Sequence, residues 1–134
     1  MNKKSNKQLA REILNREIAA LKRTTKLLDI KCEKACNAII SNKGKVITLG
    51  IGKSSFIAMK MAATLSSTGT AALFLHPVDA LHGDVGVIKK NDVVIIYSNS
   101  GETQEVIKLL PLLKLLKCYI CLLYTSDAAD EVDG

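Results

Sequence analysis

The chain has 134 residues, the size of one domain, and 48% of them are hydrophobic although only 4% are aromatic. This composition favours a parallel sheet covered by helices, and it argues against a β-sandwich or a nucleic-acid binder that stacks bases on aromatic rings. The formal net charge of +6 comes mainly from lysines and arginines near the N-terminus, and we interpret these as solvated helix positions because no aromatic residues alternate with them.

Four cysteines without a signal peptide indicate a reducing compartment, so we expect a cytoplasmic protein. No apolar stretch reaches the roughly 18 residues that a membrane span requires. The sequence therefore predicts neither a membrane nor a nucleic acid as a partner.

Two helices are predicted before the first strand. Apolar residues recur at about helical spacing over residues 9–28, and a second apolar stripe follows over residues 29–42. Gly44 comes directly afterwards, where we expect the positive φ of a helix terminus. Cys32 and Cys36 lie one turn apart on the second helix, and buried core thiols are favoured over half of a metal site.

Strands and helices alternate from residue 45 onwards. The pattern predicts a strand at 45–49, a helix at 55–67 and a short strand at 71–75. The helix residues expected to face the sheet are Ile57, Ala58, Met61, Ala62 and Leu65.

The chain from residue 76 to 117 continues this alternation. Residues 76–84 are too polar for the core, and residues 89–92 form a turn before a strand at 93–97. A helix is predicted from 104 to 117. Because proline removes a helix hydrogen bond, Pro111 predicts a kink or an early stop near its preceding residue.

A fourth apolar run, at 119–124, precedes an acidic end. Cys118 and Cys121 form a Cys-x-x-Cys pattern, but side chains at this spacing in a strand tend towards opposite faces, which argues against a redox or zinc site. No metal is therefore expected. Residues 121–134 are interpreted as an atypical and disordered tail.

Together these elements predict an α/β protein: a three-layer sandwich with a parallel sheet of about four strands, preceded by two N-terminal helices. We divide it into an N-terminal helical segment at 1–44, an αβ core at 45–120 and the tail at 121–134.

Glycines, a lysine and two hydroxyls follow the first strand at residues 50–55. Gly50 and Gly52 allow a ligand to approach the backbone, and the start of the next helix offers unpaired N–H groups to an anion. The spacing matches neither a Walker A loop nor a Rossmann fingerprint. An ordinary strand-to-helix turn is the alternative for this loop taken alone.

A second hydroxyl-rich loop follows the strand at 93–97. Ser98, Ser100 and Thr103 surround Gly101 at the start of another helix, although Ser100 could instead serve as a helix cap with Thr103 merely exposed. Parallel strands deliver both loops to the same edge of the sheet. Their combination predicts a phosphate-binding site.

Four motifs resemble a known family: Gly50-Ile51-Gly52-Lys53-Ser54, His76-Pro77, Leu81-His82-Gly83-Asp84 and Ser98-Asn99-Ser100-Gly101-Glu102-Thr103. They are similar to the sugar isomerase (SIS) domain, and specifically to its arabinose-5-phosphate isomerase branch, over about residues 9–114. The resemblance implies an incomplete flavodoxin-like SIS fold, truncated and lacking the pair of CBS modules of full-length members.

This resemblance implies an aldose–ketose isomerase that interconverts D-ribulose 5-phosphate and D-arabinose 5-phosphate through an enediol, at the entry to Kdo and lipopolysaccharide synthesis in Gram-negative bacteria. The reaction moves a proton and needs no redox cofactor. A sugar phosphate is the expected ligand, and a homo-oligomer, dimer or tetramer, is expected from the family. The truncated chain is expected to retain only part of the site, so it could bind substrate and turn over little.

Glu102 is the candidate base, Lys53 can neutralise the enediolate or the phosphate, and His82 can handle hydroxyl protons with Asp84 orienting it. His76 is interpreted as structural. A surface ion pair between Lys53 and Glu102 is the alternative for those two residues. The residues expected to bind substrate or its phosphate are Gly52, Ser54, Ser55, Ser98, Asn99, Ser100 and Thr103.

Two alternatives to catalysis remain at this point. One is a non-catalytic module that binds sugar phosphate, as in SIS domains attached to DNA-binding regulators. The other is a purely structural α/β fragment that associates through an uncovered sheet edge.

Overall fold

The computed structural model describes residues 3–124. It divides into two compact units, Met1–Cys36 and Asn37–Gly134. The acidic segment 125–134, which the sequence predicts to be a disordered tail, lies outside the described residues.

The two predicted helices precede the sheet: α1 lies in the first unit, and α2 begins in the first unit and ends in the second. Helix α1 (Asn6–Leu27) begins with a capping box, in which the Ser5 hydroxyl accepts a hydrogen bond from the Gln8 N–H and the Gln8 side chain accepts one from the Ser5 N–H. Helix α2 (Ile30–Ile40) begins after Asp29, whose carboxylate accepts bonds from the backbone N–H groups of Lys31 and Cys32. Both predicted helices are confirmed.

The burial predicted for Cys32 and Cys36 is wrong. Both cysteines are exposed, because neither α1 nor α2 contains a buried residue and so this unit has no apolar core to receive a thiol. Within residues 3–124, no helix combines the length and the apolarity that crossing a membrane requires.

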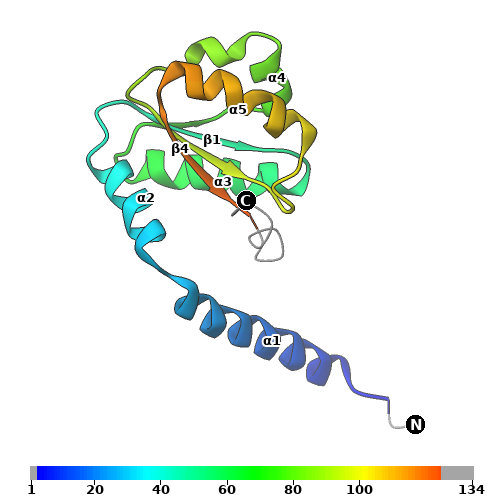
Figure 1. The fold of residues 1–134 in the computed structure, drawn as a ribbon. Helices are drawn as coiled ribbons and strands as arrows, with labels where there is room; N and C mark the ends of the chain where they lie inside the picture. Colours follow the sequence, from blue (N-terminus) through cyan, green and yellow to red (C-terminus); the bar gives the residue numbers. More distant parts are fainter. Residues whose placement is uncertain (1–2, 125–134) are drawn as a thin grey trace, which may run out of the picture. The chain divides into compact units, whose positions relative to one another are not determined.

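The second unit is built on one parallel sheet (Figure 1). Its strands are β1 (Val46–Gly50), β2 (Ala72–Phe74), β3 (Val93–Tyr97) and β4 (Tyr119–Leu123), in the spatial order β2-β1-β3-β4. The helices are α3 (Lys53–Ser67), α4 (Pro77–Leu81), the 3₁₀ turn η1 (Asp84–Val87) and α5 (Gln104–Leu116). The predicted α/β class and the four parallel strands are confirmed, and the proposed division between residues 120 and 121 falls inside β4.

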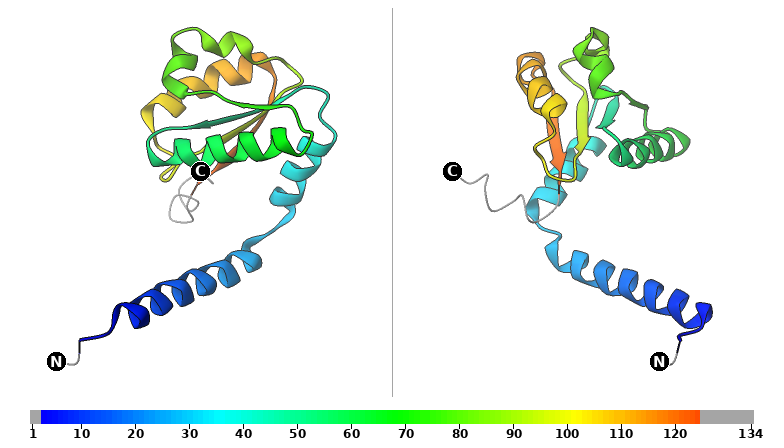
Figure 2. Two further views of the ribbon diagram at one scale, coloured as in Figure 1. Left: turned by 180° about the vertical axis from the view of Figure 1, so that it is seen from behind. Right: turned by 90° about the vertical axis from the view of Figure 1, so that its right-hand side faces the viewer.

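Helices cover both faces of this sheet, with α3 on one side and α4 and α5 on the other (Figure 1 and Figure 2). Alternation along each strand sends side chains to the two faces in turn. On the α4 and α5 side, Ile47, Leu49, Val94 and Ile96 of the central strands join one buried cluster. The opposite cluster is smaller: its buried members are Val46, Val93 and Ile95.

Cys118 packs against the larger cluster and Cys121 against the smaller one. The two thiols therefore face opposite sides of the sheet, as the strand geometry predicts. Because the two thiols lie on opposite faces, they cannot bind one metal ion together or form a disulfide with each other in this arrangement.

Three local predictions fail for identifiable reasons. Ile57 is 58% exposed because α3 turns only its small residues, including Ala58 and Ala62, fully towards the sheet. The segment 76–84 is not outside the core, since α4 forms there and buries Ala80. Of the kink or early stop predicted at Pro111, the early stop does not occur, because helix α5 continues to Leu116. Pro111 is exposed, so water can bind the carbonyl that loses its partner.

The positive φ predicted for Gly44 is wrong, because Gly44 is not among the residues with a positive φ. A close contact explains the glycine instead. A Cβ at this position would contact the Asp92 carboxylate and would lie 2.6 Å from the Asn91 carbonyl oxygen. The glycine therefore permits a close approach of two chain segments.

Asp92 joins those segments at the amino edge of the sheet. Its carboxylate is buried and accepts hydrogen bonds from the Lys45 N–H at 2.9 Å, the Lys45 ammonium at 2.7 Å and the Lys89 N–H at 2.7 Å. Burial on its own would raise the pKa of Asp92, but the Lys45 ammonium and the two N–H groups outweigh it and hold that pKa below its usual value.

Replacing Asp92 by asparagine should lower the free energy of unfolding by about 2 kcal/mol at neutral pH, because bonds to a charged acceptor are lost. A carboxylate with a lowered folded-state pKa stabilises the fold fully above its unfolded pKa of about 4, and this stabilisation is lost as the pH falls through the folded value. The difference between wild type and variant should therefore shrink below about pH 4. Urea denaturation across pH measures it. Asp79→Asn, which changes a carboxylate that forms no ion pair in the described part of the same unit, is the control, and a pH-independent difference for Asp92→Asn would contradict the prediction.

Candidate functional site

The two hydroxyl-rich loops lie at the same edge of the sheet. Strands β1 and β3 are parallel neighbours, with Gly50 in register with Tyr97, so the residues that follow these two positions leave the sheet side by side. Ser54 from the first loop and Asn99 from the second line both of two adjoining cavities. One, of about 280 Å³, is lined by Ser54, Ile57, Tyr97, Ser98, Asn99, Leu123 and Tyr124. The other, of about 580 Å³, is lined by Ile51, Lys53, Ser54, Ile57 and Asn99.

The first loop turns tightly into α3, which begins at Lys53, two residues earlier than predicted. Gly52 occupies the N-cap position with φ 59° and ψ −131°, a conformation that residues with a side chain rarely adopt. No side chain caps the helix. The Ser55 hydroxyl donates a 2.6 Å hydrogen bond back to the Gly52 carbonyl, which holds the turn closed.

The second loop is held by Ser98. This buried residue accepts a 2.9 Å hydrogen bond from the Gly101 N–H, and its hydroxyl lies 3.2 Å from the Thr103 hydroxyl. The Ser100 hydroxyl accepts a bond from the Glu102 N–H at 3.1 Å. Ser100 therefore does not cap α5: the N-cap is Thr103, which makes no side-chain capping bond and is partly buried.

Of the seven predicted phosphate-binding residues, Gly52, Ser100 and Thr103 line neither cavity, and the other four differ in position. Ser55 and Ser98 are buried and bond to their own loops, whereas Ser54 and Asn99 line the cavities. Ser98 also lines the smaller cavity. Ser55 thus only holds its loop, Ser98 both holds its loop and lines a cavity, and Ser54 and Asn99 line the cavities.

The three predicted catalytic side chains are spread more widely. Lys53 is exposed on the larger cavity, while Glu102 and His82 line neither cavity. Among residues 3–124, Lys53 and Glu102 form no ion pair, so the alternative of a surface salt bridge is not seen.

The two histidines differ in position. His76 is the N-cap of α4, where its Nδ1 accepts a 3.2 Å hydrogen bond from the Val78 N–H. This contact agrees with its interpretation as structural. His82 is the exposed C-cap of the same helix, and its imidazole is not used in capping. In the described part of the chain, no three His, Cys, Asp or Glu side chains gather in a way that could hold a metal ion.

The sequence did not predict the apolar and aromatic residues that line the smaller cavity. Ile57, Tyr97 and Tyr124 line the smaller cavity. Burial, and then the nearby Cys121, raises the pKa of Tyr97, so its phenol remains a neutral hydrogen-bond donor. Tyr124 could have been found by extending the parallel-strand argument to the fourth strand, whose carboxyl end lies at the same edge.

Curated relatives match much of this chain. Arabinose 5-phosphate isomerase KdsD of Pseudomonas aeruginosa is 53% identical over 83 residues, which are 62% of this chain and 26% of the relative. KdsD of Yersinia pestis is 42% identical over 127 residues, which are 95% of this chain and 38% of the relative. The chain spans about a third of the length of the curated relatives it matches.

Solved structures give the same fold. A protein of Escherichia coli CFT073 in complex with arabinose 5-phosphate is 38% identical, with a TM-score of 0.75 over 94% of this chain and 71% of the other. Phosphoheptose isomerase GmhA from Neisseria gonorrhoeae, 18% identical, has a TM-score of 0.71 over 94% of this chain and 78% of the other, and at that identity it shows the fold alone.

The family model described as the SIS domain matches residues 39–131. This range contains all four strands and both loops. The chain belongs to the SIS domain family.

Proposed function

We propose that the two loops bind the phosphate of a sugar phosphate and that the chain interconverts D-ribulose 5-phosphate and D-arabinose 5-phosphate. The observation that carries the proposal is the pairing of the loops at one sheet edge, together with the similar Escherichia coli CFT073 structure in complex with arabinose 5-phosphate. The match to Yersinia pestis KdsD supports the same substrate, since 127 aligned residues of a 134-residue chain must include both loops.

Phosphate recognition would use neutral donors together with the positive end of α3. Backbone N–H groups in the first turn of this helix have no side-chain cap, and helix N-termini favour anions. Ser54 and Asn99 add side-chain polar groups, and Lys53 adds a full positive charge. A phosphate monoester fits this mixture of charge and hydrogen-bond donors.

Isomerisation then requires a proton to move between C1 and C2 of the open-chain sugar. Glu102 would remove the proton from the carbon next to the carbonyl, the electron pair would form an enediolate, and the same carboxylic acid would return the proton to the neighbouring carbon. Lys53 would stabilise the developing oxyanion. His82 would move hydroxyl protons. The electrons stay within the sugar, so the reaction needs no redox cofactor.

The direct test is to incubate the purified chain with D-ribulose 5-phosphate in D₂O and to follow the products by ³¹P and ¹H NMR. We expect arabinose 5-phosphate to form without an added cofactor, with deuterium incorporated at C2. A folded chain that gives neither product nor deuterium exchange would exclude the isomerase for this polypeptide.

A second candidate is a module that binds sugar phosphate without turning it over. The placement of Glu102 and His82 outside the two cavities favours it. Calorimetric titration with arabinose 5-phosphate distinguishes the candidates: saturable binding without isomerisation supports the binding module, and binding with isomerisation supports the enzyme.

We further propose that the chain acts in the cytoplasm as a homo-oligomer, a dimer or a tetramer. Support for the assembly comes from the large exposed side chains of the second unit, among them Phe56, Ile57 and Leu115. Sedimentation equilibrium measures the assembly, and a monomer at all concentrations would contradict it.

A further inference from the structure

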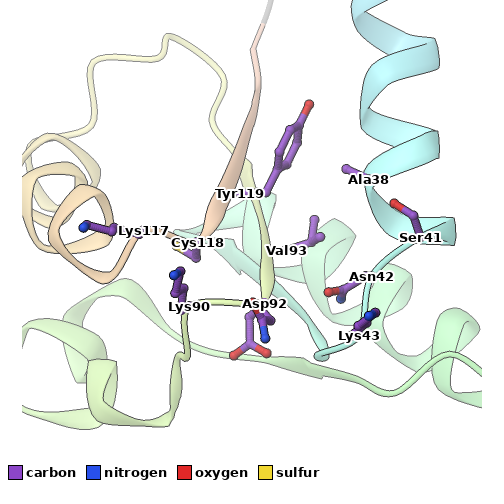
Figure 3. Close-up of a pocket in the computed structure, with 11 residues that line it drawn as sticks. Ala38, Ser41, Asn42, Lys43, Lys90, Asp92, Val93, Lys117, Cys118 and Tyr119 are labelled. Carbon is purple, nitrogen blue, oxygen red and sulfur yellow. The ribbon is translucent and has the colours of Figure 1, made fainter.

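A third cavity lies at the opposite, amino edge of the sheet and is not part of the proposed substrate site. Its volume is about 500 Å³, within the range of small-molecule sites. Because β1, β3 and β4 are parallel and begin in register, the three turns that precede them come together there. Figure 3 shows these turns and the side chains that they contribute. Among the residues that line it are Lys43, Lys90, Asp92, Lys117 and Tyr119.

Each turn supplies one lysine to this cavity: Lys43 before β1, Lys90 before β3 and Lys117 before β4. Within residues 3–124, none of the three forms an ion pair or a side-chain hydrogen bond. The one lining carboxylate belongs to Asp92, whose oxygens are already used by Lys45 and the Lys89 N–H. In Figure 3 this carboxylate points away from the Tyr119 ring. The cavity therefore carries a positive charge that the protein itself does not neutralise.

Lys117 occupies a backbone conformation that favours glycine. Its φ is 56° and its ψ is 31°, and it is the one residue other than glycine with a positive φ in the described chain. A left-handed residue with a Cβ costs roughly 1–2 kcal/mol, and helices commonly end in glycine at such a position. Lys117 is therefore an unusual residue at this position, and it lines the cavity.

Helix dipoles explain only part of this pattern. Lys43 follows the C-terminus of α2 and Lys117 that of α5, where positive side chains compensate the partial negative charge of the helix end. Lys90 lies in a turn after the four-residue 3₁₀ helix η1, so no comparable dipole lies before it. The third lysine, in the same cavity, requires another explanation.

We propose that this cavity binds a phosphorylated small molecule with two or more negative charges, held by Lys43, Lys90 and Lys117. Tyr119, 42% exposed, and Val93 and Ala38 provide an apolar side to the same space. The site lies at the far end of five-residue strands from the substrate loops, so the two sites can be occupied together. It would be a second anion site, independent of whether the chain is an isomerase.

Inorganic pyrophosphate is a suitable probe, measured by isothermal titration calorimetry with the whole chain in a phosphate-free buffer of constant ionic strength. We expect wild type to bind with a dissociation constant below about 1 mM. Lys43→Gln, Lys90→Gln and Lys117→Gln combined should weaken binding at least about tenfold, because three nearby charges are removed. Lys53→Gln, at the substrate loops, should leave a pyrophosphate site of unchanged affinity.

The matched control is the pair Lys60→Gln and Lys108→Gln, compared with the pair Lys43→Gln and Lys90→Gln, because each pair removes two positive charges. Lys60 and Lys108 are exposed on α3 and α5, and the control pair should change the affinity by less than about twofold, since exposed distant charges are screened. Equal weakening by both pairs would show diffuse attraction only, and it would overturn the proposal. Absence of binding to wild type would overturn it as well.

Lys117→Gly tests the site with a variant that is expected to fold, because glycine readily adopts the left-handed conformation of Lys117. Its melting temperature should be equal to or above that of wild type, while pyrophosphate affinity falls about threefold or more through loss of one charge. A variant of unchanged stability and unchanged affinity would remove Lys117 from the site and would contradict the proposal.

Discussion

Replacing Gly50 by alanine should lower the free energy of unfolding by about 3 kcal/mol, because the added methyl group meets backbone that cannot move away alone. An ideal Cβ at this position lies 2.6 Å from the Ser54 carbonyl oxygen, 2.8 Å from its carbonyl carbon and 3.0 Å from the Ser55 nitrogen. All three atoms belong to the first turn of α3. The helix start must therefore shift, or the strand must bend, for the variant to fold.

The same shift should affect the ligand. Ser54 lines both cavities at the loops, so displacing its backbone moves a proposed phosphate donor, and a misplacement of about 1 Å can cost on the order of 100-fold in function. Urea denaturation measures the stability of the variant, and calorimetry with arabinose 5-phosphate measures its binding.

Gly86→Ala is the matched control for this substitution. Gly86 has no positive φ, and a Cβ there meets nothing within 4 Å. This variant should unfold within about 0.5 kcal/mol of wild type, as surface changes away from special features do. If Gly50→Ala were equally mild, the tight joint between β1 and α3 would not constrain the loop.

Much of the fold could be predicted because its signals are local and repeated. The apolar runs at residues 46–50 and 93–97 are long, continuous and rich in β-branched residues, as expected for strands buried on both faces. Once they are accepted as parallel neighbours, the meeting of the two loops follows from sheet geometry alone.

The sequence could not predict which polar side chains bond to the backbone of their own loop and which line a cavity. Ser54 and Ser55 are adjacent and chemically identical, yet one lines a cavity while the other bonds to the Gly52 carbonyl. The helix start at Lys53 decides this, and helix boundaries are uncertain by one or two residues. The prediction for Gly44 failed for a related reason, because its partner Asp92 is distant in the sequence.

Substituting Glu102 by glutamine should reduce the turnover number by about 10² to 10⁴-fold, the usual contribution of a positioned general base. The structure makes this a clean substitution. Glu102 contacts the loop through its backbone N–H, which bonds to the Ser100 hydroxyl, so exchanging the side chain leaves that contact in place. Binding of sugar phosphate should therefore persist while proton transfer fails.

The readout that separates this role from a structural one is the exchange of the C2 hydrogen with solvent. In D₂O, Glu102→Gln should lose both exchange and isomerisation, and its dissociation constant for arabinose 5-phosphate should stay within about threefold of wild type, because a group needed only in the transition state contributes little to ground-state binding. Glu105→Gln makes the same chemical change in the first turn of α5 and should keep its activity within about twofold, since its carboxylate contributes only to the helix dipole. A large loss of affinity in Glu102→Gln, with turnover falling only in proportion, would instead assign Glu102 to binding and leave the base to another residue.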